Sequence, residues 1–314
     1  MQIMTDGVDR VPEGVATAVS VGAYDGIHLG HQSVLSSLAS LASDRGLQPG
    51  VVTFDQHPAA VLRPENAPLM LTDHEQRIEL FADIGIEYLY LLQFNAERAE
   101  TTDREFVTDV IVGRMNAKLV VVGSNFHFGK ARSGSVDSLR EFGDEMGFEV
   151  IGLDLLAESD AVEPISSTAI RRALAGGDIE AVNTMLGRHY EVRGEVVQGD
   201  QRGRTIGFPT ANIAFEAGRA WPAKGVYAAW TTLGDGQRVA TAVNIGLRPT
   251  FHQHADQPLL EAHLLDFDED LYGQNLQVEF VGFLRSERRF SGIDEIAEQL
   301  KKDVEHARTV LQNP

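Results

Sequence analysis

Two histidines, His28 and His31, lie in the segment with the clearest chemical signal, residues 22–32. A hydrophobic stretch runs there into a glycine-rich turn, and a spacing of three at a helix start places both imidazoles on one face. Glycine lets a ligand approach the backbone, and the free N–H groups of a helix start favour an anion. The segment therefore predicts a phosphate site; a zinc pair, which lacks further ligands, and a plain turn with surface histidines are the alternatives. Four other residues of the turn are expected to contribute to phosphate binding: Gly22, Tyr24, Asp25 and Gly30.

Alternating strands and helices are expected to position these histidines. The predicted strands are residues 18–22, 49–54, 88–93, 119–123 and 148–153, and the predicted helices are 31–45, 73–84, 102–115 and 134–146. Continuous Val/Leu runs suit strands buried on both faces, and the alternation predicts a parallel, Rossmann-like sheet. Ligands bind beyond the carboxyl ends of such strands, so His28, His31 and Asn125 are expected to share one crevice.

Two more segments of the first half suggest nucleotide binding. Asn125 lies between glycines after a predicted strand; the nearby spacing of Gly129 and Gly134 is not a phosphate loop, because Ser135-Val136 replaces Lys-Ser/Thr. A plain strand-turn-helix is the alternative there. The second segment, residues 165–172, places Ser167 and Thr168 before a helix and Arg171 one turn into it. Helix capping explains the hydroxyls, and the added arginine suggests a triphosphate site.

A glycine-flanked basic loop opens the second half of the chain. Gly203, Arg204 and Gly207 suggest a mobile phosphate lid, and Thr210 and Asn212 alternate along a short predicted strand and so face one side. Two neutral oxygens together with phosphate oxygens suit Mg²⁺, which needs few protein ligands. A hairpin loop with Thr and Asn as turn formers is the alternative.

Glu261 lies inside an apolar predicted strand between Leu260 and Ala262. A carboxylate there can be desolvated, as a general base requires, although a solvent-facing glutamate is the alternative. The acidic run that follows, at 266, 268 and 270, does not match a calcium loop, because glycine falls at its eighth position rather than its sixth.

Short strands and turns dominate the chain from residue 190 onward. The predicted strands are 190–198, 209–213, 225–233, 238–245, 259–265 and 276–284, with two short helices before them at 169–175 and 179–186 and an amphipathic helix after them at 293–311. This spacing predicts a closed or half-closed antiparallel barrel. Near Gly187 the predicted pattern changes from strands and helices to short strands and turns. We therefore place the domain boundary there, giving domains 1–187 and 188–314.

Composition narrows the classes of partner. The net charge of −19 disfavours nucleic acid, and the chain has no cysteines, so disulfides and thiol chemistry are excluded. No apolar run approaches the roughly 20 residues of a membrane span. We expect a cytoplasmic protein that uses neither nucleic acid nor membrane and needs no obligate protein partner.

Together these segments resemble the bacterial bifunctional riboflavin kinase/FAD synthetase family. The resemblance covers about residues 15–308 and also rests on Phe54-Asp55-Gln56-His57-Pro58 and on residues 244–251 and 261–273. It implies an N-terminal FMN adenylyltransferase domain and a C-terminal riboflavin kinase domain. Riboflavin would be phosphorylated by ATP to FMN, and FMN adenylylated by a second ATP to FAD with release of pyrophosphate.

The resemblance also implies roles for residues. His28 and His31 would stabilise the phosphates of adenylyl transfer, Thr210 and Asn212 would hold Mg²⁺ with ATP, and Glu261 would be the kinase base. Asn125, Ser167, Thr168 and Arg171 would bind ATP.

The chain departs from the family pattern at three positions. Tyr24 stands where Phe is common, and Asn125 and His127 stand where many members have Asp and Arg. Two other functions stay open. One is a single-activity enzyme with the other half reduced to a binding module; the other is a non-catalytic flavin sensor acting on RNA, which the acidic charge disfavours.

Overall fold

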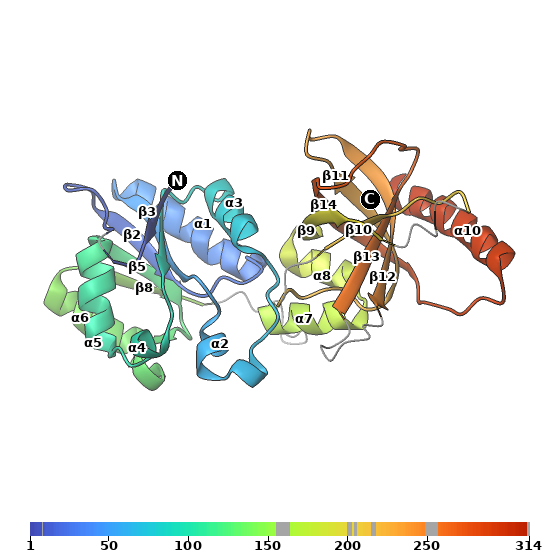
Figure 1. Cartoon of the computed structure of the whole chain (residues 1–314). Coiled ribbons are helices and arrows are strands. Elements are labelled where there is room, and N and C mark those ends of the chain that lie inside the picture. The colour runs from blue at the N-terminus through green and yellow to red at the C-terminus, as the bar shows by residue number, and fades with distance from the viewer. Residues whose placement is uncertain are drawn as a thin grey trace. The chain divides into compact units, whose positions relative to one another are not determined.

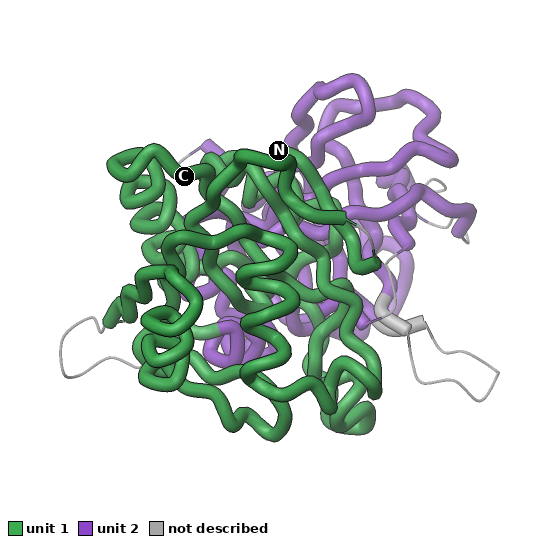
Figure 2. The backbone as a smooth tube through the Cα atoms, turned by 90° about the vertical axis from the view of Figure 1, so that its left-hand side faces the viewer, with its two compact units in different colours: residues 1–166 green, residues 167–314 purple. Residues whose placement is uncertain are grey.

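The computed structural model describes residues 1–7, 9–154, 164–199, 203, 206–214, 218–248 and 257–312. Its backbone separates into two compact units, residues 1–166 and 167–314 (Figure 2). Arg204, predicted to belong to the phosphate lid, lies outside the described residues.

The first unit is built on a six-stranded sheet in which all neighbouring strands are parallel (Figure 1). In spatial order its strands are β1 (Gln2–Thr5), β4 (Tyr88–Leu92), β3 (Gln48–Phe54), β2 (Thr17–Val21), β5 (Ala117–Gly123) and β8 (Glu149–Leu153). The predicted parallel sheet is confirmed. The edge strand β1 was not predicted, because its four residues are too few to give a pattern.

Helices cover both faces of this sheet, as the continuous apolar runs require. Val19 and Val120 face one cluster and Ala18 and Leu119 the other. One face packs on α1 (Leu29–Asp44) and α3 (His74–Asp83), and the other on α5 (Asp103–Phe106), η2 (Val107–Arg114) and α6 (Val136–Met146). Shorter elements complete the unit: α2 (Pro58–Leu62), η1 (Pro64–Asn66), α4 (Ala96–Ala99), β6 (His127–Phe128), η3 (Lys130–Arg132) and β7 (Gly134–Ser135).

Three predicted helices differ in detail. The first begins at Leu29 rather than at residue 31, because the His28 side chain caps it. The predicted helix 102–115 continues from α5 into a wider π-helical segment, η2. The predicted helix 134–146 begins at Val136, because Ser135 caps it and Gly134 pairs in β7.

The second unit is a closed antiparallel barrel preceded by two helices and followed by one. The helices α7 (Ser167–Gly176) and α8 (Ile179–Leu186) come first. The barrel order is β10 (Ala211–Ile213), β13 (Gln257–Leu264), β12 (Arg238–Arg248), β11 (Gly225–Thr232), β14 (Asn275–Arg285) and β9 (Tyr190–Val197), which returns to β10. The C-terminal helix α10 (Ile293–Gln312) packs its Ala307 and Leu311 against Ala228 and Ala242.

The two helices before the barrel pack with it. Asn183 of α8 donates from Nδ2 to the Phe280 carbonyl oxygen (2.9 Å), and its Oδ1 accepts from the Tyr190 N–H (2.8 Å). Compact packing therefore divides the chain at residue 166. The functional domains predicted from the change to short strands, 1–187 and 188–314, stay a prediction.

Candidate active sites

The turn between β2 and α1 is strained. Tyr24 (φ 48°), Gly26 (φ 82°) and Ile27 (φ 35°) all adopt left-handed backbone conformations. Non-glycine residues in this region cost about 1 to 3 kcal/mol each and persist only where surrounding structure holds them. Tyr24 and Ile27 are buried, so the hydrophobic core contributes to holding the turn.

His28 and His31 lie at the end of this turn with their rings stacked, centroid to centroid, at 3.7 Å. His28 is the helix N-cap, and its Nδ1 accepts the His31 N–H at 3.3 Å. A neutral His28 therefore carries its proton on Nε2, where it is a donor. The structure confirms that the two imidazoles lie together.

Burial and repulsion from His28 hold the pKa of His31 well below its usual range. His31 is thus neutral at pH 7, and its Nδ1 has no hydrogen-bond partner among the described residues. At pH 7 the His31 ring therefore adds no positive charge to the turn and is available for hydrogen bonding. Gly30 leaves room for this arrangement, since a Cβ there would lie 3.2 Å from the His28 ring.

Tyr24 and Asp25 support the turn rather than face an open site. The Tyr24 hydroxyl shares a 2.5 Å hydrogen bond with Ser20 Oγ, and its ring meets His31 edge-on at 5.1 Å. The Asp25 carboxylate is buried and accepts the N–H groups of Leu71 (2.8 Å) and Thr72 (3.2 Å). Gly22 lies against the Tyr24 ring, where a Cβ would approach it to 3.0 Å.

Asn125 lies after β5, the strand that pairs with β2 in parallel. The carboxyl ends of adjacent parallel strands share one sheet edge, so Asn125 and the histidine turn emerge at the same edge. Asn125 is exposed, and its carbonyl oxygen lies 3.0 Å from the Nδ1 of exposed His127. Ser167, Thr168 and Arg171 lie in the first two turns of α7, which belongs to the second unit.

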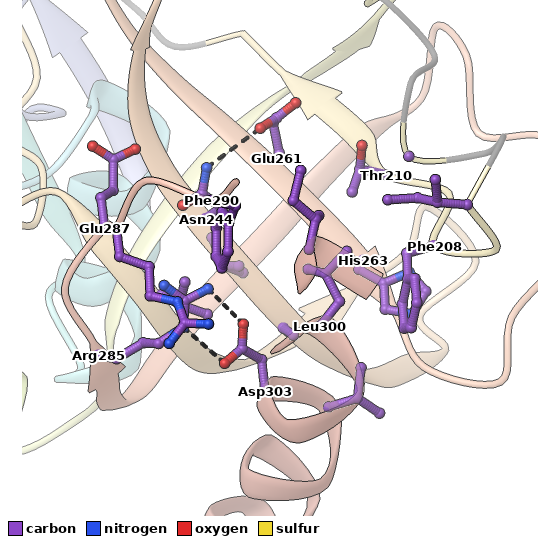
Figure 3. A pocket seen from close by; sticks show the side chains of 18 of the residues that line it. Phe208, Thr210, Asn244, Glu261, His263, Arg285, Glu287, Phe290, Leu300 and Asp303 are labelled. Carbon is purple, nitrogen blue, oxygen red and sulfur yellow. Dashed lines mark hydrogen bonds and ion pairs between the residues drawn. The ribbon is translucent and has the colours of Figure 1, made fainter. Parts of the chain in front are cut away.

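The second site is a cavity of about 780 Å³ between the barrel and α10 (Figure 3). Its floor holds a row of polar side chains across three strands, in which Glu261 of β13 pairs in register with Asn212 of β10 and Asn244 of β12. Asn244 Nδ2 donates to Glu261 Oε2 at 3.3 Å. Leu260 and Ala262 on either side of Glu261 are fully buried, so the strand's alternation turns the carboxylate into the cavity.

Thr210 and Asn212 lie on the same side, as the alternation predicted, and they line the same cavity as Glu261. Asn212 is buried, Thr210 is exposed, and a Cβ at Gly199 would collide with the Asn212 amide. Within the described ranges no cluster of three His, Cys, Asp or Glu could hold a metal. Two neutral oxygens beside a cavity fit Mg²⁺ that takes its remaining ligands from phosphates and water.

A smaller cavity of about 360 Å³ adjoins this one, and Thr210 lines both. Its wall includes Asp268, Asp270 and Tyr272 from the segment after β13. Gly203 lines the larger cavity, and its carbonyl oxygen accepts the N–H groups of Ile206 (3.1 Å) and Phe208 (2.9 Å). Gly207 is exposed and left-handed (φ 83°), as expected of a glycine in a tight loop.

Two family models match the chain. The model described as FAD synthetase matches residues 12–169, and the model described as riboflavin kinase matches residues 186–311. A Bacillus subtilis protein named bifunctional riboflavin kinase/FMN adenylyltransferase is 36% identical over 304 residues, covering 96% of this chain and 94% of the relative. The chain belongs to this family.

Other members of the bifunctional riboflavin kinase/FMN adenylyltransferase family are equally complete matches. The Haemophilus influenzae member is 35% identical and covers 97% of both chains. A crystal structure from Streptococcus pneumoniae, described as a macrolide-efflux protein, matches with a TM-score of 0.87 at 30% identity over 98% of both chains. Among the described residues of the present chain, no helix is long and apolar enough to cross a membrane.

Several of the residues that line the larger cavity were not singled out from the sequence. Asn244 sits in a segment that supports the family resemblance, but only strand register reveals that it faces Glu261. Arg285 and Asp303 form a bidentate ion pair (2.8 and 2.6 Å) that ties the end of β14 to α10 beside the cavity. Their 18-residue separation across a loop gives no periodic signal.

Proposed function

We propose that this chain phosphorylates riboflavin to FMN and adenylylates FMN to FAD, using ATP in both reactions. The observation that carries the kinase half is the row Asn212–Glu261–Asn244 on the cavity floor. The stacked histidines at the turn after β2, of which His31 is neutral at pH 7, support the transferase half. The membership of the family, whose named members carry both activities, supports the pairing of the two reactions.

In the kinase half, riboflavin would occupy the larger cavity, since its hydroxyl must reach Glu261. ATP would occupy the smaller cavity, with its γ-phosphate at Thr210, the residue that lines both. The 5′-hydroxyl oxygen of riboflavin bonds to the γ-phosphorus while Glu261 takes the hydroxyl proton. The bond between the γ-phosphorus and the bridging oxygen breaks, and ADP leaves with its electrons. Mg²⁺ bound with ATP would be held by Thr210 and Asn212 and would offset phosphate charge.

In the transferase half, the FMN phosphate is already an anionic nucleophile. Its oxygen attacks the α-phosphorus of ATP, and pyrophosphate leaves. His28, which donates from Nε2 when neutral, and His31 would stabilise the charge that develops on the phosphates. Gly30 lets those phosphates approach the helix start, and Asn125, Ser167, Thr168 and Arg171 are proposed to bind ATP. The lid residues Gly203, Arg204 and Gly207 are proposed to close over phosphates in the kinase half.

The proposal includes a cytoplasmic location and action without nucleic acid, membrane or an obligate protein partner. The acidic net charge of −19 supports the first two exclusions, because it repels polyanions and anionic lipid surfaces.

One assay tests both reactions. The purified protein is incubated with riboflavin, Mg²⁺ and ATP, and the flavins are separated by chromatography. Formation of FMN and then FAD is expected. FMN alone would identify a single-activity kinase, and unchanged riboflavin together with no FAD from supplied FMN would refute the proposal.

A further inference from the structure

The strained histidine turn is held from outside by one short stretch of chain, residues 71–77. Thr72 Oγ1 accepts the Gly26 N–H at 3.2 Å. The N–H groups of Leu71 and Thr72 both donate to the Asp25 carboxylate, and the Thr72 hydroxyl adds a 3.4 Å contact to it. The two left-handed residues 26 and 27 therefore directly follow Asp25, whose carboxylate is bound by Leu71 and Thr72.

Arg77 extends the same support to the start of the turn. It is 3% exposed and donates from Nη1 to the Ala23 carbonyl oxygen (3.4 Å) and from Nη2 to the Phe54 carbonyl oxygen (3.0 Å). Ala23 follows β2 and Phe54 ends β3, so one guanidinium joins the carboxyl ends of two neighbouring strands. Burial lowers the pKa of Arg77, and the nearby Asp25, Asp55 and Asp73 oppose that effect.

The start of α3 fixes residues 71–77 themselves. Asp73 caps the helix by accepting the Gln76 N–H (2.7 Å), and the Gln76 side chain accepts the Asp73 N–H (3.0 Å) in return. Thr72 therefore directly precedes a helix end that a reciprocal capping box holds. These contacts give the turn the surrounding support that a strained backbone requires.

We infer that residues 71–77 are a positioning element for adenylyl transfer: they hold the turn so that His28 and His31 stay stacked at the phosphate site. The inference rests on the proposed transferase function. It assigns Asp25, Thr72 and Arg77 to support of the histidines rather than to contact with substrate. Long-range contacts are needed because the turn's own sequence, with Tyr24 and Ile27 left-handed, does not favour its conformation.

The test removes one hydroxyl. Thr72→Val keeps the shape of a buried side chain but leaves the Gly26 N–H without its acceptor, whereas Thr72→Ser keeps the hydroxyl. Thr17→Val is the matched control, because Thr17 is equally buried in the same unit and donates to the Met115 carbonyl oxygen (2.6 Å) at the opposite end of β2. Each full-length variant is assayed for FAD formation from FMN and for FMN formation from riboflavin.

We expect kcat for FAD formation to fall about tenfold or more in Thr72→Val, because a turn that loses this contact would misplace the histidines, and to stay near wild type in the other two variants. FMN formation is expected to be unchanged in all three. The histidine ring signals in ¹H–¹⁵N NMR should shift in Thr72→Val and not in Thr17→Val. Unaltered FAD formation and ring signals in Thr72→Val, or equal losses in Thr72→Val and Thr17→Val, would overturn the inference. A wild-type protein that makes no FAD would instead refute the proposed function, and the ring signals would still test the support.

Discussion

The histidine turn and the Glu261 row are positioned by different kinds of backbone. The row lies on regular strands, and register alone places Asn212, Glu261 and Asn244 side by side. The histidines follow a turn with three left-handed residues, which depends on contacts from a segment more than 40 residues away. Regular strand pairing positions a site without left-handed residues and in a way that a sequence pattern can predict. An irregular turn positions one only with contacts from other parts of the chain.

The largest effect is expected from Glu261→Gln. The change is nearly isosteric, but an amide takes no proton, so kcat for FMN formation should fall by about 10²- to 10⁴-fold. FAD formation from supplied FMN should continue, because the histidine turn lies in the other unit. Glu279→Gln is the control, since Glu279 is a barrel carboxylate that pairs with Arg238 and does not line the cavity. Near-normal FMN formation by Glu261→Gln would remove the base assignment.

His31→Ala should do the converse. Loss of a preorganised donor at developing phosphate charge lowers kcat by about 10²- to 10³-fold, so FAD formation should fall by that amount while FMN formation persists. His306→Ala is the comparison, because His306 is an exposed histidine of α10 that lines neither cavity. A folded His31→Ala protein that loses riboflavin phosphorylation would contradict the separation of the two sites.

A smaller effect is expected from shortening the second unit. The fragments 167–314 and 188–314 both contain the proposed kinase residues, but only the longer one keeps Asn183 and its hydrogen bonds to Phe280 and Tyr190. Those two bonds contribute about 2 kcal/mol, so the shorter fragment should have the lower free energy of unfolding in urea. Equal stabilities would show that α7 and α8 are dispensable to the barrel.

The smallest effect concerns pH. The pKa of His31 is depressed in the folded protein, so below about pH 6.5 the unfolded chain binds a proton that the folded chain does not. The free energy of unfolding should therefore fall with decreasing pH, by up to about 1.4 kcal/mol per pH unit more in the wild type than in His31→Gln. Urea titrations of both proteins between pH 5 and 7.5 measure this difference; parallel curves would place His31 in a solvated setting.

Sequence patterns predicted those parts of the molecule in which periodicity carries the information. Alternation along the predicted strand correctly put Thr210 and Asn212 on one side, and both line the cavity that Glu261 also lines. The glycine-rich turn suggested phosphate binding by Asp25 but gave no sign that its carboxylate accepts hydrogen bonds from Leu71 and Thr72. No local pattern could reveal that contact, because it joins two irregular segments that only the folded sheet brings together.

The register of β13 determines what a mispaired barrel strand would do to the protein. Successive strand residues point to opposite faces, so a slip of one position would bury the Glu261 carboxylate in the barrel and turn Leu260 or Ala262 outward. Such a molecule would lose its proposed base and its core packing in the same event. If Glu261 is the base, a mispaired chain is expected to make no FMN, and the FMN made by a freshly refolded sample would then count the chains that closed their barrel correctly.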